Sequence, residues 1–392
     1  MVAQPKRLGS IGRLLMGTNI RSVATALPDH LVEPAIALAA LRRFWPQLDR
    51  LIETKTDLGT RYLCEPLERQ LQPRGLTELH DSYLKHAKRL VGHAASEALL
   101  AAGISGRDVD MLVTVSCTGY LVPSLDVYLV EELGLRCDVI RVPITELGCS
   151  AGASAIAIAH RHILAFPEHR VLVMAVELPS LNFHAADHSV DNLTACLVFG
   201  DGAGAAVLDG SDNPGTGLTV LQTASHLVPR STHLLGFALR DGGFHVVLDR
   251  RLARLLAGEL RPVVDRFMAA CGLASFDFVA AHAAGPRIFD VLEETLTLPP
   301  DALDMSREVF TAIGNTSSAA IFFVLQRLIE TPAETALQGL GLGLGPGVSI
   351  ELMHLAWMPS KHSGYKAVAP REGVPVGRGS IEQHFLSTNS VN

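Results

Sequence analysis

The sequence has no long apolar run and no leader-like beginning. Nothing in its 392 residues approaches the roughly 18 consecutive apolar residues that mark a membrane-spanning helix. The first twenty residues carry two early basic side chains, but no extended apolar stretch and no clear cleavage site follow. We therefore expect a soluble, cytoplasmic protein without a membrane span.

The sequence also lacks metal-binding cysteine motifs and a basic patch. Its six cysteines are widely spaced, and no CxxC pair or Cys/His cluster has metal-ligand spacing. This favours free thiols, a reducing compartment and no bound metal ion. His160 and His162 are interpreted as solvated or hydrogen-bonded surface groups. A net charge of −7 with scattered Lys and Arg leaves no footprint for nucleic acid, so we expect small-molecule substrates.

The sequence contains enough hydrophobic residues to form a large core. Of the 392 residues, 48% are hydrophobic, and strand-type and helix-type segments alternate, which predicts a well-packed α/β protein. The segment GSDNPGTG at 210–217 interrupts this pattern. We predict an N-terminal half at 1–215, a C-terminal half at 216–358 and a polar tail at 359–392.

Some elements can be predicted individually. A long helix is expected over 82–102, closed by Gly103. Residues 111–134 predict a strand, a turn and a second helix. The glycine-rich run from Gly339 is interpreted as a loop that precedes the last strand. It lacks the Lys-Ser/Thr pair of a phosphate loop and does not open a helix, so we do not expect it to bind a nucleotide.

Cys149 stands at a predicted corner between a strand and a helix. The apolar segment DVIRVPI precedes it, and a helix-type segment runs from Ala153 to Leu164. Backbone N–H groups and the positive end of a helix dipole favour an anion there, so the thiol would tend toward the thiolate that attacks carbonyl carbon. This stretch alone is equally compatible with a small buried hydrophobe at the position.

The second half repeats the pattern of the first. Cys117 precedes Cys149 by 32 residues (149 − 117), and His282 precedes Asn315 by 33 (315 − 282). A duplicated unit would put GCSAGASA and GNTSSAAI at equivalent corners, although two small-residue turns can be similar by chance. If the halves pack about a pseudo-twofold axis, Cys149, His282 and Asn315 meet in one pocket. There His282 would pair with the thiolate, and both partners would donate to an enolate, each worth roughly 3 kcal/mol.

At these residues the chain resembles the type III polyketide synthases, the chalcone-synthase-like family, and its bacterial members in particular. The likeness runs from about Ile20 to Trp357 and is carried by several motifs. They are ELGCSAG at Cys149, LVFGDGAGAAVL at Phe199, GFHVVL at Phe244, HAAGPRIFD at His282, GNTSSA at Asn315 and GLGPG at Gly343 to Gly347. Related ketoacyl synthases usually continue the histidine as His-Gln-Ala-Asn, which this chain does not.

The resemblance implies a thiolase-like fold, with two duplicated βα halves packed as a layered αβαβα core. It implies an acyltransferase that loads an acyl-CoA starter on Cys149. His282 and Asn315 would then drive decarboxylative condensation with malonyl-CoA, and the poly-β-keto chain would close to a phenolic (phloroglucinol-, resorcinol- or naphthalene-type) or pyrone product. The resemblance implies a homodimer. It also implies that the substrates are coenzyme A thioesters and that no metal or other cofactor is needed. The alternatives are a single-condensation enzyme like β-ketoacyl-ACP synthase III and a non-catalytic thiolase-fold scaffold.

The resemblance also places residues around the reaction cavity and its entrance, namely Phe199, Phe244, Cys117, Asn182 and Val122. The two phenylalanines would form the gate between the coenzyme A tunnel and the cavity. The cysteine would line the cavity, with a second acyl site as the less favoured alternative. The asparagine and the valine would face the cavity or the dimer interface. Lys55 falls where a family member binds the coenzyme A phosphates, although leucines replace its basic neighbours.

Overall fold

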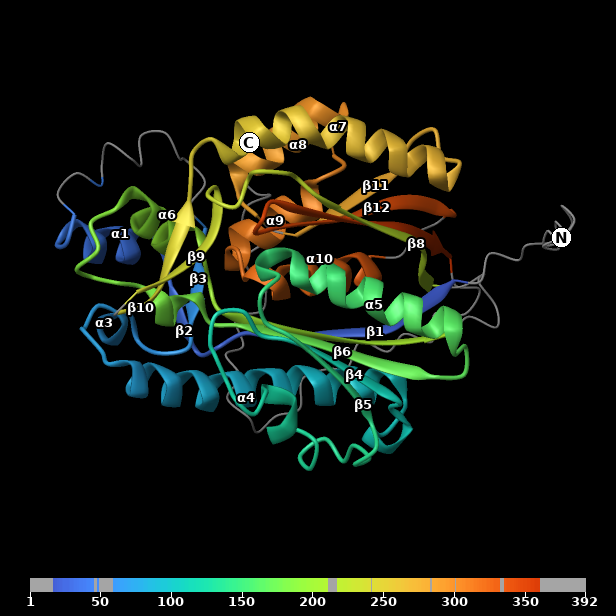
Figure 1. Cartoon of the computed structure of the whole chain (residues 1–392), viewed down its shortest axis with the longest axis horizontal. Coiled ribbons are helices and arrows are strands. Elements are labelled where there is room, and N and C mark those ends of the chain that lie inside the picture. The colour runs from blue at the N-terminus through green and yellow to red at the C-terminus, as the bar shows by residue number, and fades with distance from the viewer. Residues whose placement is uncertain are drawn as a thin grey trace, which may run out of the picture.

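The computed structural model describes residues 17–45, 48, 59–210, 217–240, 242–282, 284–299, 301–331 and 335–359. In these residues helices and strands stack in five layers, with α7 (Leu252–Cys271) and α8 (Pro286–Leu296) at the top of Figure 1, α5 (Ala151–Ala165) and α10 (Ala320–Glu330) in the middle and α4 (Leu76–Ala102) at the bottom. The outer helices are α7 and α8 on one side and α4 on the other. The central helices are α5 and α10. The predicted αβαβα core is confirmed.

The strands between these helices form one mixed sheet in the described residues. Its order is β11-β12-β13-β8-β1-β7-β6-β4-β5. The C-terminal group is β11 (Phe278–Ala281), β12 (Leu337–Gly345), β13 (Ser349–Met358) and β8 (Gly217–Leu227). The N-terminal group is β1 (Thr18–Ala26), β7 (Gly202–Gly210), β6 (Arg170–Glu177), β4 (Met111–Val115) and β5 (Ile140–Ile144). β1 joins the two groups, because it pairs antiparallel with β7 along its length and with β8 at three positions.

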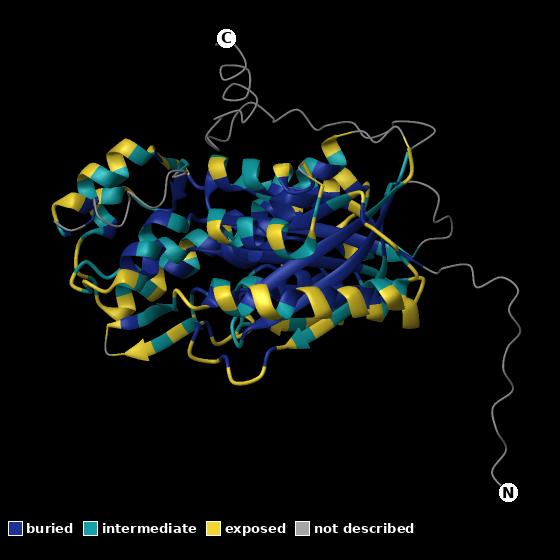
Figure 2. Ribbon diagram, turned by 90° about the horizontal axis from the view of Figure 1, so that it is seen from above, coloured by how far each residue is buried: buried dark blue, intermediate teal, exposed yellow. Residues whose placement is uncertain are grey.

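Each sheet face packs against helices, so the strands are apolar on both sides. In β6, Val171 and Val173 point into the central core with α5, while Leu172 and Met174 point toward α4. This alternation is what strand geometry requires, and double burial explains the continuous apolar run in the sequence. Figure 2 shows the buried residues concentrated in the sheet and the central helices, with exposed residues on the outward helix faces. No described helix is long and apolar enough to span a membrane.

A smaller group of elements lies at the left of Figure 1, beyond the ends of the sheet strands. Its helices are α1 (Pro34–Arg42), α3 (Leu67–Gln70), α6 (Val190–Val198) and, toward the core, α9 (Asp304–Ile313). Its strands are the pair β2 (His30–Val32) and β3 (Arg61–Leu63) and the hairpin β9 (Leu235–Arg240) and β10 (Gly243–Leu248). This group supplies one wall of the cavity described below.

Two predicted elements differ in the structure. The helix that closes at Gly103 is confirmed, with Gly103 left-handed at φ 68, but it begins at Leu76, six residues before the predicted start. The helix predicted before Gly134 is only the short 3-10 turn Leu125–Tyr128. Asp126 in this turn is buried and pairs with Arg141 of β5. The turn is therefore held by a side-chain contact with a neighbouring strand, and not by the apolar face of a regular helix.

The glycine-rich run from Gly339 is a strand, β12, and not the predicted loop. Its leucines fill the outer core, whereas its glycines leave the opposite face without side chains. A Cβ atom on Gly343 would lie 2.7 Å from the Cβ of Ala153, and one on Gly345 would meet Ser150. The glycines therefore let the beginning of α5 approach the strand closely.

His160 is buried, contrary to the surface position expected from the sequence. Its ring Nδ1 lies 2.9 Å from Thr18 Oγ1, and 2% of the residue is exposed. The division into halves stays a prediction, because its boundary falls at 211–216, outside the described residues. The tail from residue 360 onward also lies outside them.

Candidate active site

A cavity lies between the layered core and the smaller group of elements. Mostly aliphatic and aromatic side chains line it, with a few polar groups, as is usual for a small-molecule site. Three residues singled out from the sequence line this cavity: Cys149, Phe199 and Asn182. Ser317, Thr118 and Phe237, which the sequence did not single out, line it as well.

Cys149 lies in a single 3-10 turn, Gly148–Ser150, at the start of α5. Gly148 has φ 55 and faces Pro346, which a Cβ atom would strike, so glycine is required there. The Cys149 Sγ lies 3.2 Å from the Ser317 Oγ, which belongs to the turn before α10. The two predicted corners, one from each half, therefore meet at the cavity.

Burial raises the pKa of the Cys149 thiol to about 11, and the negative charge of Glu177 adds to this shift, while the contact with Ser317 opposes it. The sequence suggested a thiolate stabilised by the helix N-terminus. In the folded protein desolvation is the larger effect, so the resting sulfur carries its proton. The hydrogen bonds of the described residues place Ser317 beside the Cys149 Sγ and the Leu344 N–H beside the His282 ring, and none joins Cys149 to His282.

His282 follows strand β11 and is 3% exposed. Burial lowers its pKa to about 4, so the ring is neutral at pH 7. The backbone N–H of Leu344 donates to His282 Nδ1 at 3.3 Å, which places the ring proton on Nε2. His282 is thus prepared to donate a hydrogen bond through Nε2 rather than to hold an anion by charge.

Asn315 stands between α9 and the turn that contains Ser317. Its Nδ2 donates to the Ala284 carbonyl at 3.2 Å, and its Oδ1 accepts from the Ser317 N–H at 2.8 Å. The Ala284 N–H in turn donates to the His282 carbonyl at 2.7 Å. A continuous series of contacts therefore connects Cys149 through Ser317, Asn315 and Ala284 to His282, although neither His282 nor Asn315 contributes to the cavity lining.

The Asn315 backbone also fixes the segment that carries Phe199. The Asn315 N–H donates to the Val198 carbonyl at 2.9 Å, and the Gly200 N–H donates to the Asn315 carbonyl at 3.1 Å. Phe199 is held at the cavity wall in this way. The corner at Asn315 is entered from helix α9, whereas strand β5 precedes the corner at Cys149, so the two repeats differ here.

Beneath these residues lies Glu177, which the sequence analysis missed. It is fully buried at the end of β6 and accepts hydrogen bonds from Thr118 Oγ1 at 2.8 Å, from the Cys117 N–H at 3.1 Å and from Ser318 Oγ. Burial raises its pKa. The only sequence signal was a single acid within a continuous apolar strand, which is ambiguous until its partners are known.

Cys117 lies under the Cys149 corner, with its Sγ 3.6 Å from the Gly148 carbonyl. The adjacent Thr118 contributes to the cavity lining and Cys117 does not, so its lining role stays a prediction. Asn182, which is 8% exposed, donates to the Thr118 carbonyl at 2.7 Å and contributes to the cavity lining.

Phe244, the second predicted gate residue, lies behind a residue of the cavity wall. Phe244 in β10 does not contribute to the cavity lining; its ring packs edge-to-face on Phe237, with the centroids 5.9 Å apart, and Phe237 lines the cavity. Val122 is 76% exposed and does not contribute to the lining of the cavity in its own chain, so its place at the cavity or at a dimer interface stays a prediction. Lys55 lies outside the described residues.

Within the residues that the structure describes, no group of three or more His, Cys, Asp or Glu side chains is arranged to hold a metal ion. The described cysteines all have free thiols.

Comparison with known proteins covers most of the chain. Residues 64–213 match the family described as chalcone and stilbene synthases, N-terminal domain, and residues 219–359 match the corresponding C-terminal domain. A 1,3,6,8-tetrahydroxynaphthalene synthase from Streptomyces griseus is 36% identical over 345 residues, which covers 85% of this chain and 91% of that protein. A phloroglucinol synthase from Pseudomonas fluorescens is 30% identical, covering 84% and 91%.

The fold agrees with these relatives. The crystal structure of 1,3,6,8-tetrahydroxynaphthalene synthase from Streptomyces coelicolor A3(2), a bacterial type III polyketide synthase, superposes with a TM-score of 0.82 at 32% identity. The superposition covers 87% of this chain and all of that one. Germicidin synthase from the same species gives a TM-score of 0.81 at 26% identity, with 88% of this chain covered.

Proposed function

This chain belongs to the chalcone and stilbene synthase family and is a type III polyketide synthase, and on that premise we propose how its own residues perform the reaction. It extends an acyl-CoA starter with malonyl-CoA and cyclises the product to a phenolic or pyrone ring. The contact series from Cys149 to His282 carries the proposal, because it connects a nucleophile to two hydrogen-bond donors from the other half of the chain.

Cys149 loads the starter. Its sulfur attacks the thioester carbonyl, a new C–S bond forms, and the bond to coenzyme A breaks. The thiol proton leaves on the coenzyme A sulfur, so no net proton is gained or lost. Because the raised pKa of Cys149 leaves the resting thiol protonated, that proton must be lost as the sulfur attacks.

His282 and Asn315 act on malonyl-CoA. Their donors bind the thioester carbonyl oxygen, carbon dioxide leaves, and the electron pair of the broken C–C bond becomes an enolate. The enolate attacks the acyl carbon on Cys149: a new C–C bond forms, the C–S bond to Cys149 breaks, and the extended chain is left on coenzyme A while the Cys149 sulfur is released. A neutral His282 with its proton on Nε2 supports this role. One hydrogen of the Asn315 amide is used by Ala284, and the second remains available for the substrate.

The cavity sets the starter and the number of extensions through its volume. Phe199 forms the gate toward the coenzyme A side, with Phe244 behind Phe237 as its second part, while Asn182 and Cys117 shape the wall and floor. The names of the two synthase relatives support a phenolic ring as the product class.

Several further features belong to the same proposal. The substrates are coenzyme A thioesters, Lys55 contacts the coenzyme A phosphates, and no metal or other cofactor takes part. The enzyme works in the cytoplasm as a homodimer, with neither nucleic acid nor a membrane as partner. Residues 1–215 form the half that carries the nucleophile, and 216–358 form the half that carries His282 and Asn315.

Incubation of the purified protein with malonyl-CoA, alone and with a panel of acyl-CoA starters, tests the proposal. We expect multiply extended, cyclised products by mass spectrometry. A single condensation that strictly requires acyl carrier protein would replace the proposal with a ketoacyl synthase. Retention of cellular function by Cys149→Ala would favour a scaffold instead.

A further inference from the structure

A serine hydroxyl lies at the sulfur of Cys149. Ser317 is 5% exposed and contributes to the cavity lining, and its Oγ lies 3.2 Å from the Cys149 Sγ. In the part of the chain that the structure describes, this sulfur is the only protein hydrogen-bond partner of the Ser317 Oγ. The reaction steps above give this contact no role.

The backbone at Ser317 is held in a conformation that serine rarely adopts. Its φ is 52, in the left-handed region that favours glycine. Two other described non-glycine residues have a positive φ, Arg230 and Thr297, and both are exposed, whereas Ser317 is buried. The Ser317 N–H donates to Asn315 Oδ1 at 2.8 Å, which fixes the turn before α10. A strained backbone that directs a hydroxyl at the nucleophile indicates a functional role.

The other surroundings of Cys149 disfavour an anion. Burial, and then the negative charge of Glu177, raise the pKa of this thiol, whereas Ser317 is the side chain that lowers it. No cation acts on the sulfur in the described part of the chain. His282 is neutral at pH 7, because burial lowers its pKa to about 4. A hydrogen bond from the Ser317 hydroxyl is therefore the stabilisation that a side chain offers to a thiolate here.

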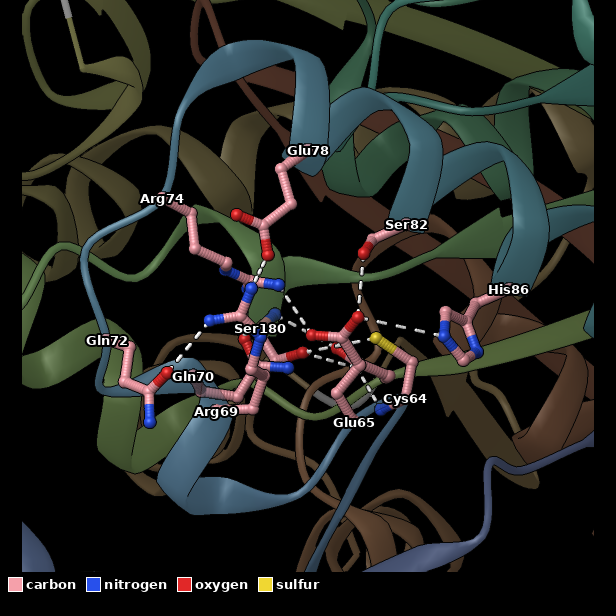
Figure 3. A network of polar contacts seen from close by, with 11 residues as sticks. Cys64, Glu65, Arg69, Gln70, Gln72, Arg74, Glu78, Ser82, His86 and Ser180 are labelled. Carbon is pink, nitrogen blue, oxygen red and sulfur yellow. Dashed lines mark hydrogen bonds and ion pairs between the residues drawn. The ribbon is translucent and has the colours of Figure 1, made fainter.

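A second contact between a serine and a cysteine shows that proximity alone does not give this arrangement. The Cys64 Sγ lies 3.7 Å from the Ser180 Oγ (Figure 3). The Ser180 hydroxyl donates its proton to Asp201 Oδ2 at 2.5 Å, so no proton remains for the sulfur. No carboxylate accepts from the Ser317 hydroxyl among the described residues, so its proton is available to Cys149.

Each condensation leaves a negative charge on the Cys149 sulfur. The charge of the malonyl carboxylate passes to the enolate when carbon dioxide leaves, and to the sulfur when the C–S bond to Cys149 breaks. We propose that the Ser317 hydroxyl donates a hydrogen bond to this thiolate and so prepares it to receive the extended chain.

In the next step the thiolate attacks the new coenzyme A thioester, a C–S bond forms, and the charge leaves on the coenzyme A sulfur. Ser317 keeps its own proton throughout, so the hydroxyl acts by hydrogen bonding alone. The proposal rests on the polyketide synthase function above, because that reaction supplies the thiolate.

Two variants of Ser317 test this role. Ser317→Ala and Ser317→Gly both remove the hydroxyl, and the glycine also relieves the backbone strain. The rate at which iodoacetamide alkylates Cys149 at pH 8, measured by mass spectrometry of the peptide that carries it, should fall about tenfold in both variants. The thiolate is the reactive form, and loss of one hydrogen bond to it should raise the pKa of the thiol by about one unit.

The same variants should make shorter products. With one starter and malonyl-CoA, mass spectrometry should show fewer extensions, because the sulfur takes up the chain more slowly in each round. Release of carbon dioxide from malonyl-CoA should stay near the wild-type rate, since His282 and Asn315 are unchanged.

Ser154→Ala is the matched control. Ser154 lies one turn into α5, does not line the cavity and donates to the Ser150 carbonyl at 3.1 Å. The same chemical change there should leave both the alkylation rate and the product length as in the wild type.

An unchanged alkylation rate or product length in both Ser317 variants overturns this inference. A loss in Ser317→Ala that is absent in Ser317→Gly also overturns it, because the backbone and not the hydroxyl would then be responsible. Both results leave the proposed function intact. Absence of extended products from the wild type with every starter overturns the proposed function itself.

Discussion

At the scale of single residues, the local sequence around Cys149 and its burial in the fold shift the pKa of the thiol in opposite directions. A helix N-terminus favours the thiolate, and this effect can be inferred from a few neighbouring residues. Burial in the folded protein raises the pKa instead, although the contact with Ser317, which comes from far along the chain, opposes this rise. The place of Cys149 at the start of a helix could therefore be predicted from the sequence, but the ionisation state of its thiol could not.

Substitutions in the two halves should separate the two partial reactions. Cys149→Ala should lose starter loading while malonyl-CoA decarboxylation persists, because His282 and Asn315 remain in place. Asn315→Ala should load a starter normally but lose decarboxylation by about a hundredfold or more, as is typical when one oxyanion donor is removed. Intact-protein mass spectrometry measures loading, and release of carbon dioxide measures decarboxylation. Equal loss of both reactions in each variant would contradict this assignment of roles.

Glu177 shows which residues escape sequence reasoning. It is a polar side chain whose role depends on two partners far from it in the chain, Thr118 and Ser318. A sequence motif can identify a functional residue only when the residues next to it in the sequence are also characteristic of the function. A buried acid or amide becomes recognisable only when folding shows what surrounds it.

At the scale of elements, helices and strands with one dominant period could be predicted, and those with special packing could not. The long helix before Gly103 and the strand Arg170–Glu177 have the expected apolar patterns. The strand β12 has glycine at every second position, which indicates a loop by composition. Its glycines instead allow close contact with α5, a tertiary requirement that no local rule contains.

The burial of His160 between α5 and β1 makes stability depend on pH. Burial lowers its pKa to about 4, whereas the unfolded chain titrates near 6.5. As the pH falls from about 6.5 to 4, the unfolded state takes up a proton that the folded state refuses. The free energy of unfolding then falls, by up to about 3 kcal/mol for this group. His282 contributes with the same sign.

Urea unfolding at pH 7.5 and pH 5.0 measures this effect. In His160→Gln, which keeps polar atoms near Thr18, the loss of stability between the two pH values should be smaller than in the wild type. His233→Gln changes an exposed histidine and should leave the wild-type difference unchanged. An identical pH dependence in His160→Gln and the wild type would show that His160 titrates normally in the folded protein.

At the scale of the whole molecule, the edge strand β5 and the segments that flank it in the sequence carry exposed hydrophobic side chains. Several large hydrophobic side chains near the edge strand β5 are at least 40% exposed: Tyr120, Val122, Val127, Ile140 and Leu147. Such a patch beside an unpaired strand edge is typical of a contact between copies of a chain. The sequence suggested a dimer only through family resemblance, because the patch is assembled from residues of three separate segments.

We predict that this face forms the homodimer interface. The double variant Val122→Asp and Ile140→Asp should shift the protein from dimer to monomer, as measured by size-exclusion chromatography with light scattering, because two charges on each copy would be desolvated on association. Leu100→Asp places a charge on the outer helix α4 at a residue that is 51% exposed, and should leave the dimer intact. A monomeric wild type, or a dimeric double variant, would refute the assignment.

The strand that unites the sheet also dictates an order of events during synthesis. Thr18 must pair with both Gly210 and Val220, so β1 leaves the ribosome long before either partner exists. At about 5 to 20 residues per second, the delay is on the order of ten seconds or more. Throughout that interval the backbone of β1 lacks its hydrogen-bonding partner strands. The two groups of strands can join into one sheet only after residue 227 has emerged. The speed of translation between β1 and β8 therefore sets how long β1 stays unpaired. During that time the nascent chain can mispair, and a chaperone that covers β1 would protect it.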